Sequence, residues 1–287
     1  MKDEFARFHP LVNLIFFIIV LGLTMFQMQL GLVLISVFSA LVYYLYLKKR
    51  SGVKYLLVVS CIFVISSLMN PLFSHKGNTL LFYLFTGNPV TLESIVYGIV
   101  SSAIICGMLI WFSIFHQVMG IERMLGAIGK FMPHIALLIT MILRFIPKYT
   151  KHQKEVALFN KVHEEQSLKT KIKKGGKIFS ITTTWALENS IDTADSMKAR
   201  GFGVKKRTSY SNYKVEVRDI GVIVWIFVLA GSVIWMLQGE RIYTYYYPYV
   251  VYKGNMAAYV LYALLCLTPV FINIREEVRW RRLKSKM

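Results

Sequence analysis

A single arginine near the end of a long polar segment is the residue of this chain best placed for specific chemistry. Arg200 stands between Ala199 and Gly201 in the stretch DSMKARGFGVKKR, which covers residues 195–207. A cation in the last turn of a helix is stabilised by the helix dipole, by about 0.3–1 kcal/mol, so Arg200 can serve its own helix alone. Its small neighbours also leave the guanidinium free to enter an acidic groove and bind a carboxylate through two parallel hydrogen bonds. The triplet Ala199, Arg200 and Gly201 is therefore the candidate site.

Residue types that commonly carry catalysis or bind metals lack the necessary spacing. The six histidines show no paired ligand spacing and no H-E-x-x-H sequence. The cysteines Cys61, Cys106 and Cys266 lie in separate apolar segments, which favours packing roles over a disulfide or a metal site. We predict no catalytic residue and no metal site in this chain.

A phosphate-binding loop is also missing from the sequence. Gly129-Lys130 and Gly176-Lys177 both lack the earlier glycine and the following Ser or Thr of a Walker A loop. We therefore expect no cofactor on this chain, and any ATP must be bound by a partner.

The composition indicates a lipid environment. Hydrophobic residues make up 55% of the 287 residues, above the roughly 45–50% of soluble domains. A helix over residues 11–47 would be about 55 Å long, against a hydrocarbon core of roughly 30 Å, so we expect a turn at the glutamines before Gly31. The apolar runs predict six transmembrane helices, at about 11–28, 30–47, 55–73, 94–115, 220–238 and 255–273.

Basic residues are concentrated on one side of this topology. Of 34 lysines and arginines, only Lys76, Arg241 and Lys253 fall on the other side. By the positive-inside rule, both termini and residues 116–218 are predicted to lie in the cytoplasm, in a multi-pass protein of the cell membrane. Attraction to the anionic headgroups of the lipid bilayer adds to this bias. No aromatic-interleaved basic surface indicates nucleic acid as a partner.

The sequence therefore predicts an all-α membrane protein in three parts. Residues 1–115 form the N-terminal transmembrane helices, residues 116–218 a helical cytoplasmic or interfacial domain, and residues 219–287 the last two spans with a basic tail. In the middle part, residues 120–133 predict a helix in the interface plane. The apolar residues 134–147 are too short to cross and predict a helix buried beneath the spans.

Two long polar helices are expected next, one after Lys148 and one after the glycine pair at 175 and 176. The second has apolar residues at helical spacing, among them Trp185, and an acidic stripe on another face. That stripe consists of Glu188, Asp192 and Asp195. Gly201 is expected to be the left-handed residue that ends this helix.

The order of several short motifs is similar to that of a known family. Arg144-Phe145-Ile146-Pro147, two polar helices and Ala199-Arg200-Gly201, all behind membrane spans, resemble the T component of energy-coupling factor (ECF) transporters, a family that includes cobalt-transport permease subunits. The likeness covers nearly the whole chain. It also takes in the following short stretches: His9-Pro10, Asn70-Pro71-Leu72-Phe73, His75-Lys76-Gly77 and Thr91-Leu92-Glu93.

The resemblance implies a scaffold and energy-coupling subunit of an ABC-type importer for a vitamin or a metal ion, without enzyme activity of its own. Two cytoplasmic ATPases of the ABC type would dock on the long helices of the cytoplasmic part. A small membrane-embedded substrate-binding subunit, the S component, would capture the solute. Ala199, Arg200 and Gly201 would form one of two coupling triplets, each inserted into a groove of one ATPase.

The first coupling triplet departs from the family pattern. Counted from Arg144, it falls at Val162-His163-Glu164, where histidine replaces arginine and neither neighbour is small. Three alternatives remain. Lys161 makes the contact, His163 makes it, or that ATPase is held mainly by apolar packing and His163 is an ordinary surface residue.

Two other classes of protein compete with a coupling subunit. A self-sufficient secondary transporter is expected to show internal repeats and intramembrane polar or broken-helix sites. A membrane-embedded enzyme is expected to carry clustered His, Asp or Glu in facing spans. The predicted spans show none of these features, since Glu93 and Asp219 lie only at span ends.

Overall fold

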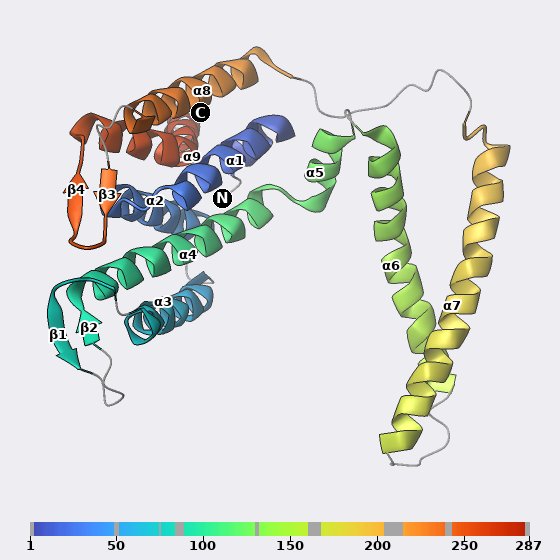
Figure 1. Ribbon diagram of the computed structural model, residues 1–287. Helices are drawn as coiled ribbons and strands as arrows, with labels where there is room; N and C mark the ends of the chain where they lie inside the picture. The colour runs from blue at the N-terminus through green and yellow to red at the C-terminus, as the bar shows by residue number, and fades with distance from the viewer. Residues whose placement is uncertain are drawn as a thin grey trace. The chain divides into compact units, whose positions relative to one another are not determined.

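The computed structural model describes residues 3–48, 52–74, 76–83, 89–129, 132–159, 168–203, 215–238 and 243–284. A short 3-10 helix, η1 (Phe5–Arg7), precedes the α-helices (Figure 1). These are α1 (Pro10–Phe26), α2 (Leu30–Lys48), α3 (Val53–Phe73), α4 (Leu92–Val118), α5 (Ile121–Ile128), α6 (Pro133–Phe159), α7 (Leu168–Ala199), α8 (Val217–Gln238) and α9 (Met256–Lys284). The chain divides into two compact units, Met1–Met124 with Tyr213–Met287, here called the bundle, and Leu125–Asn212, here called the helix pair.

The apolar runs of the sequence coincide with helices of the bundle. Among the described residues, α2, α3, α4, α8 and α9 are long and apolar enough to cross a membrane by length and composition. The remaining predicted span corresponds to α1, which is apolar but has 17 residues and is therefore only about 26 Å long. The helix content and the apolar helices are those of an all-α, multi-pass membrane protein.

The turn between the first two helices lies where the sequence predicts it, but Gly31 has another role. α1 ends at Phe26 and α2 begins at Leu30, so the glutamines form the turn. Gly31 belongs to the first turn of α2, and a Cβ atom there would lie 2.9 Å from the ring of Tyr259. The glycine therefore allows α2 to approach α9 closely.

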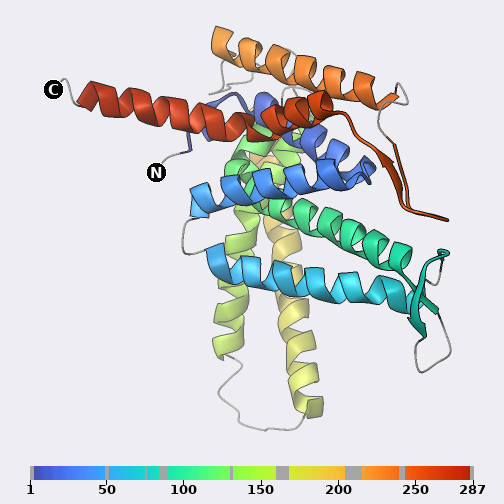
Figure 2. The same ribbon diagram turned by 90° about the vertical axis from the view of Figure 1, so that its left-hand side faces the viewer.

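The helices of the bundle pack in the order α3, α4, α2, α9, α8, with α1 against both α4 and α8 (Figures 1 and 2). Its core is aromatic at one level. The indole of Trp111 lies edge-on to Phe16 and Phe17, with ring centroids 6.1 and 6.2 Å apart, and all three side chains are buried. α3 packs on α4 at one side and leaves most of its large apolar side chains exposed, as expected for a helix facing lipid.

Two short antiparallel strand pairs make the all-α prediction incomplete. β1 (Leu80–Tyr83) pairs with β2 (Pro89–Thr91) before α4, and β3 (Tyr243–Tyr245) pairs with β4 (Val251–Lys253) before α9. Both pairs lie at the end of the bundle opposite the two chain termini (Figure 2). Strand pairs of three or four residues give too short an alternation to be recognised in the sequence.

The described connections between successive helices lie alternately at one end of the bundle and at the other. At one end, the Gln29 amide donates to the carbonyl of Lys253 at 2.9 Å, and the Tyr246 hydroxyl donates to the carbonyl of Met28. At the other end, Asn273 Oδ1 accepts from the backbone N–H groups of Glu4 and Phe5 at 2.8 and 3.1 Å. The described residues of both chain ends therefore lie at the end opposite Lys253, as the basic asymmetry requires.

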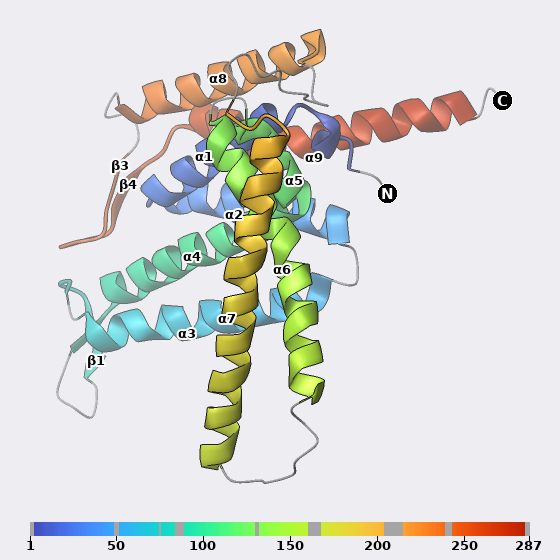
Figure 3. The ribbon, with the colours of Figure 1, turned by 90° about the vertical axis from the view of Figure 1, so that its right-hand side faces the viewer.

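The helices observed between residues 134 and 199 differ from the predicted helices. α6 continues through Pro147, and α7 begins at Leu168 and continues through both glycines (Figure 3). Proline removes one hydrogen bond and each glycine costs about 1 kcal/mol, which the good helix formers on either side offset. Within the helix pair no described residue of α6 is buried, and the burial of residues 134–147 beneath the spans stays a prediction.

A buried polar cluster joins four helices of the bundle. The Thr24 hydroxyl donates to the Val20 carbonyl at 2.7 Å, so the Ser36 and Tyr262 hydroxyls, at 2.8 and 3.0 Å, must both donate to Thr24. Trp111 Nε1–H donates to Ser36 Oγ at 3.1 Å. Thr24 and Ser36 together thus connect α1, α2, α4 and α9 through groups that lipid could not satisfy.

We expect Ser36→Ala to lower the free energy of unfolding by about 1–2 kcal/mol, because the buried indole N–H of Trp111 loses its acceptor. The measurement is reversible unfolding of the purified protein in mixed micelles with increasing denaturing detergent.

Ser39→Ala is the matched control for this substitution. Ser39 lies in the same helix and is equally buried, but its hydroxyl donates only to the Ile35 carbonyl of its own helix, at 2.6 Å. Equal losses for the two variants would show that the cluster adds no stability between helices.

Candidate functional site

The end of α7 has the geometry that the sequence predicts. Gly201 has a φ of 79°, in the left-handed region, and its N–H donates to the Lys198 carbonyl at 2.9 Å. The N–H of Phe202 donates to the Met197 carbonyl, also at 2.9 Å. These two bonds form a Schellman motif, which ends the helix sharply just after Arg200.

Arg200 is exposed at this helix end. Within the part of the chain that the structure describes, no carboxylate lies within ion-pair distance of its guanidinium. The nearby cation Lys198 does have one, Asp195, at 3.9 Å, although both side chains are more than 70% exposed. Among the described residues, no carboxylate uses the N–H donors of the Arg200 guanidinium.

The C-terminal half of α7 has charges of both signs. Glu188, Asp192 and Asp195 are exposed, as the acidic stripe in the sequence suggests. Lys198 and Arg200 follow Asp195 by three and five residues. A surface that binds this end of α7 must therefore offer an acidic groove for the arginine and basic groups beside the stripe.

α6 and α7 run antiparallel and touch near their midpoints (Figures 1 and 3). Trp185 of α7 is the centre of this contact. The His152 ring stacks on it with centroids 4.1 Å apart, and the Tyr149 ring meets it edge-on at 5.5 Å. Lys148 Nζ lies 5.4 Å from the Trp185 ring and donates to Asn189 Oδ1 at 2.6 Å. One aromatic side chain thus braces the two helices against each other.

The Arg144-Phe145-Ile146-Pro147 motif lies directly before this contact. Phe145 stacks on Tyr149 with ring centroids 5.7 Å apart. Helical spacing in the sequence marks Trp185, but its ring partners on α6 were not predicted. The spacing of Phe145, Tyr149 and His152, four and then three residues, marks one helix face and could have predicted them.

Two other motifs of the sequence have structural roles at helix starts. His9 caps α1 by accepting from the Leu11 N–H at 3.2 Å, and Pro10 fills the first helical position. Thr91 caps α4, and the buried Glu93 accepts from the Thr79 N–H at 3.2 Å. Both motifs hold the backbone in place at the start of an apolar helix.

The degenerate first coupling motif, Lys161, Val162, His163 and Glu164, lies outside the described residues. In the described ranges, no group of three or more His, Cys, Asp or Glu side chains is arranged to hold a metal ion. Only the triplet at the end of α7 can therefore be described as a candidate site.

We expect Trp185→Ala to weaken the contact between α6 and α7 by about 1–3 kcal/mol, because it removes two aromatic contacts and a cation–π contact. Limited proteolysis should then cleave within residues 125–212 faster. Phe179→Ala is the control, since Phe179 lies on the same helix and is 71% exposed. Cleavage rates that are alike in the two variants would contradict the bracing role of Trp185.

A scan of the chain against protein-family models finds no match, and a search of the curated proteins finds none. The function of this chain is therefore inferred from its own residues and their geometry.

Proposed function

We propose that this chain is the scaffold and energy-coupling subunit of an ABC-type importer of the energy-coupling factor class, for a vitamin or a metal ion. Two ATPases bind and hydrolyse ATP, and a separate S component binds the solute. The chain transmits the movement of the ATPases to that component.

One observation carries the proposal. Arg200 is an exposed guanidinium at the closed end of a 32-residue helix, and no carboxylate pairs with it in the described part of the chain. The helix end by itself accounts for Gly201, whose positive φ favours glycine, but it does not require a small residue at position 199. Ala199 and Gly201 leave room for a groove to enclose the guanidinium and to exclude water from it. In such a groove, two parallel hydrogen bonds between the guanidinium and a carboxylate are stronger than they are in water.

The exposed apolar side chains of the helix pair support the proposal that partner proteins dock on it. Ile135, Leu138, Ile142 and Ile146 recur at helical spacing on α6 and are 49–56% exposed. On α7, Leu187 and Ile191 are 62% and 63% exposed. Apolar stripes of this kind on helices mark interaction surfaces.

The bracing of α6 by α7 suits the transmission of force. All backbone hydrogen bonds of a helix are internal, so a push on its end moves it as a rigid body. α7 is about 48 Å long, and its contact with α6 lies at Trp185 and not at the tip. A displacement of the Arg200 end by an ATPase would therefore be passed to α6 as well.

Arg200→Ala should leave the membrane fold intact, since a helix-end cation contributes under about 1 kcal/mol to its helix. It should weaken ATPase docking by about 2–5 kcal/mol, because the carboxylate of the partner is left buried and unpaired. Arg200→Lys should restore docking only in part, since lysine keeps the charge but loses the planar fork. The measurement is co-purification of the two ATPases, with solute uptake in parallel.

Lys198→Ala provides the matched control, because it removes an exposed cation from the same helical turn. We expect it to reduce docking by much less than Arg200→Ala. Normal assembly and normal uptake in Arg200→Ala would reduce Arg200 to a helix cap and refute the coupling role.

The proposed orientation is tested with a membrane-impermeant maleimide. In a Cys61→Ala background, Lys173→Cys should be labelled only after the inner face is made accessible, and Lys253→Cys should be labelled in intact cells. Both lysines are exposed, and they belong to the segments with opposite predicted sides. Labelling of Lys173→Cys from outside would overturn the topology.

A further inference from the structure

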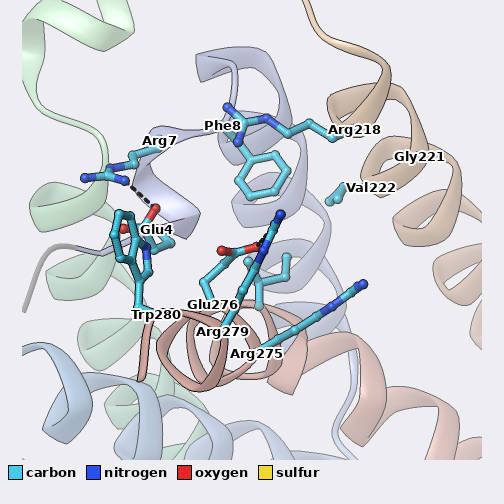
Figure 4. Close-up of a pocket in the computed structure, with 11 residues that line it drawn as sticks. Glu4, Arg7, Phe8, Arg218, Gly221, Val222, Arg275, Glu276, Arg279 and Trp280 are labelled. Carbon is cyan, nitrogen blue, oxygen red and sulfur yellow. Dashed lines mark hydrogen bonds and ion pairs between the residues drawn. The ribbon is translucent and has the colours of Figure 1, made fainter. Parts of the chain in front are cut away.

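A cavity of about 510 Å³ opens in the bundle between the N-terminal segment, the start of α8 and the C-terminal half of α9 (Figure 4). Its wall contains four arginines, Arg7, Arg218, Arg275 and Arg279, but only two carboxylates. The cavity therefore has an excess of positive charge.

The arginines of the wall differ in how they are paired. Arg7 and Arg279 lie 2.7 and 3.6 Å from the wall carboxylates Glu4 and Glu276. Arg218 pairs at 2.8 Å with Glu216, which is outside the wall. Arg275 is exposed and has no carboxylate within ion-pair distance in the described ranges. Since each guanidinium has five N–H donors and a carboxylate takes about two, the wall has free donors for an anion with several oxygens.

The cavity lies where the apolar parts of three helices begin or end. The apolar residues of α9 stop at Ile274, directly before Arg275, and those of α8 start at Ile220, directly after Asp219. The apolar run of the first helix, α1, likewise starts between Phe8 and Pro10. In the predicted topology this level is that of the lipid headgroups, where tryptophan is also enriched, and Trp280 lines the cavity.

An apolar track leads away from the cavity along α8. Ile220, Val224, Phe227 and Val228 recur at helical spacing and are 53–61% exposed. The track begins beside Gly221 and Val222 of the cavity wall. Inside the cavity, the Arg218 guanidinium lies 5.2 Å from the centre of the Phe8 ring, so charged and apolar groups alternate in the wall (Figure 4).

We propose that this cavity binds the phosphate of an anionic glycerophospholipid, with Arg275 and Arg279 as its principal ligands and the acyl chains along the exposed face of α8. The basic end of the bundle is predicted to face the cytoplasmic leaflet, where anionic lipids are abundant and basic pockets between helices bind their headgroups. The inference depends on the bundle alone and is independent of the coupling role of Arg200.

The test is native mass spectrometry of the full chain, released from micelles that contain phosphatidylglycerol or phosphatidylcholine with identical acyl chains. The wild type should retain one phosphatidylglycerol in preference to phosphatidylcholine. In the variant Arg275→Gln with Arg279→Gln, the affinity for phosphatidylglycerol should fall about 30-fold, from the loss of two arginines near the membrane surface.

Arg281→Gln with Arg282→Gln removes the same charge from the same helix, outside the cavity wall, and should keep the preference. Arg275→Gln alone breaks no ion pair, so it should shift the affinity in the same direction without harming the fold. An equal loss in both double variants, or no lipid preference in the wild type, would overturn the proposal. So would full displacement of the lipid by inorganic phosphate, which would assign the cavity to a free anion.

Discussion

A bundle of helices in lipid has no water to satisfy the polar side chains that it buries, so a buried group without a partner in the protein costs several kcal/mol. The cluster around Ser36 avoids this cost by joining residues of four helices. Apolar surfaces alone would let these helices slide or rotate at little cost, since lipid tails are as apolar as the helices. The hydrogen bonds of Ser36 to Thr24 and Trp111, and of Thr24 to Tyr262, fix a single register, and the aromatic core packs around it.

The same cost explains the other end of the bundle. Asp219 is buried and accepts from the N–H groups of His9 and Glu216, at 3.4 and 2.9 Å, so one carboxylate serves the starts of α1 and α8. The positive ends of two helix dipoles stabilise its charge. Asn273 ties the N-terminal segment to α9 in the same way. These bonds bring residues from both chain ends together, and the arginine-lined cavity forms between them.

The helix pair differs from the bundle in that it buries few of its side chains. α6 buries none of its described residues, and one half-buried tryptophan holds it to α7. Such a pair leaves its apolar stripes and the charged end of α7 available to other proteins. A stiff pair with an unsatisfied surface suits the proposed coupling role, whereas a satisfied core suits a membrane bundle. The described residues divide these two features between separate units.

Local features of the sequence determined the helices of this protein. Runs of apolar residues located the spans because length and hydropathy suffice in lipid, and Gly201 located the end of α7 because only glycine adopts its backbone conformation at no cost. The partners of Trp185 and the passage of α6 through Pro147 were decided by tertiary structure, as was the lack of a carboxylate partner for Arg200 among the described residues. Gly31 against Tyr259, the Ser36 cluster and the cavity join residues more than two hundred positions apart along the chain. Helical periodicity shows which face of a helix is apolar, but the choice of its partner depends on how whole helices pack.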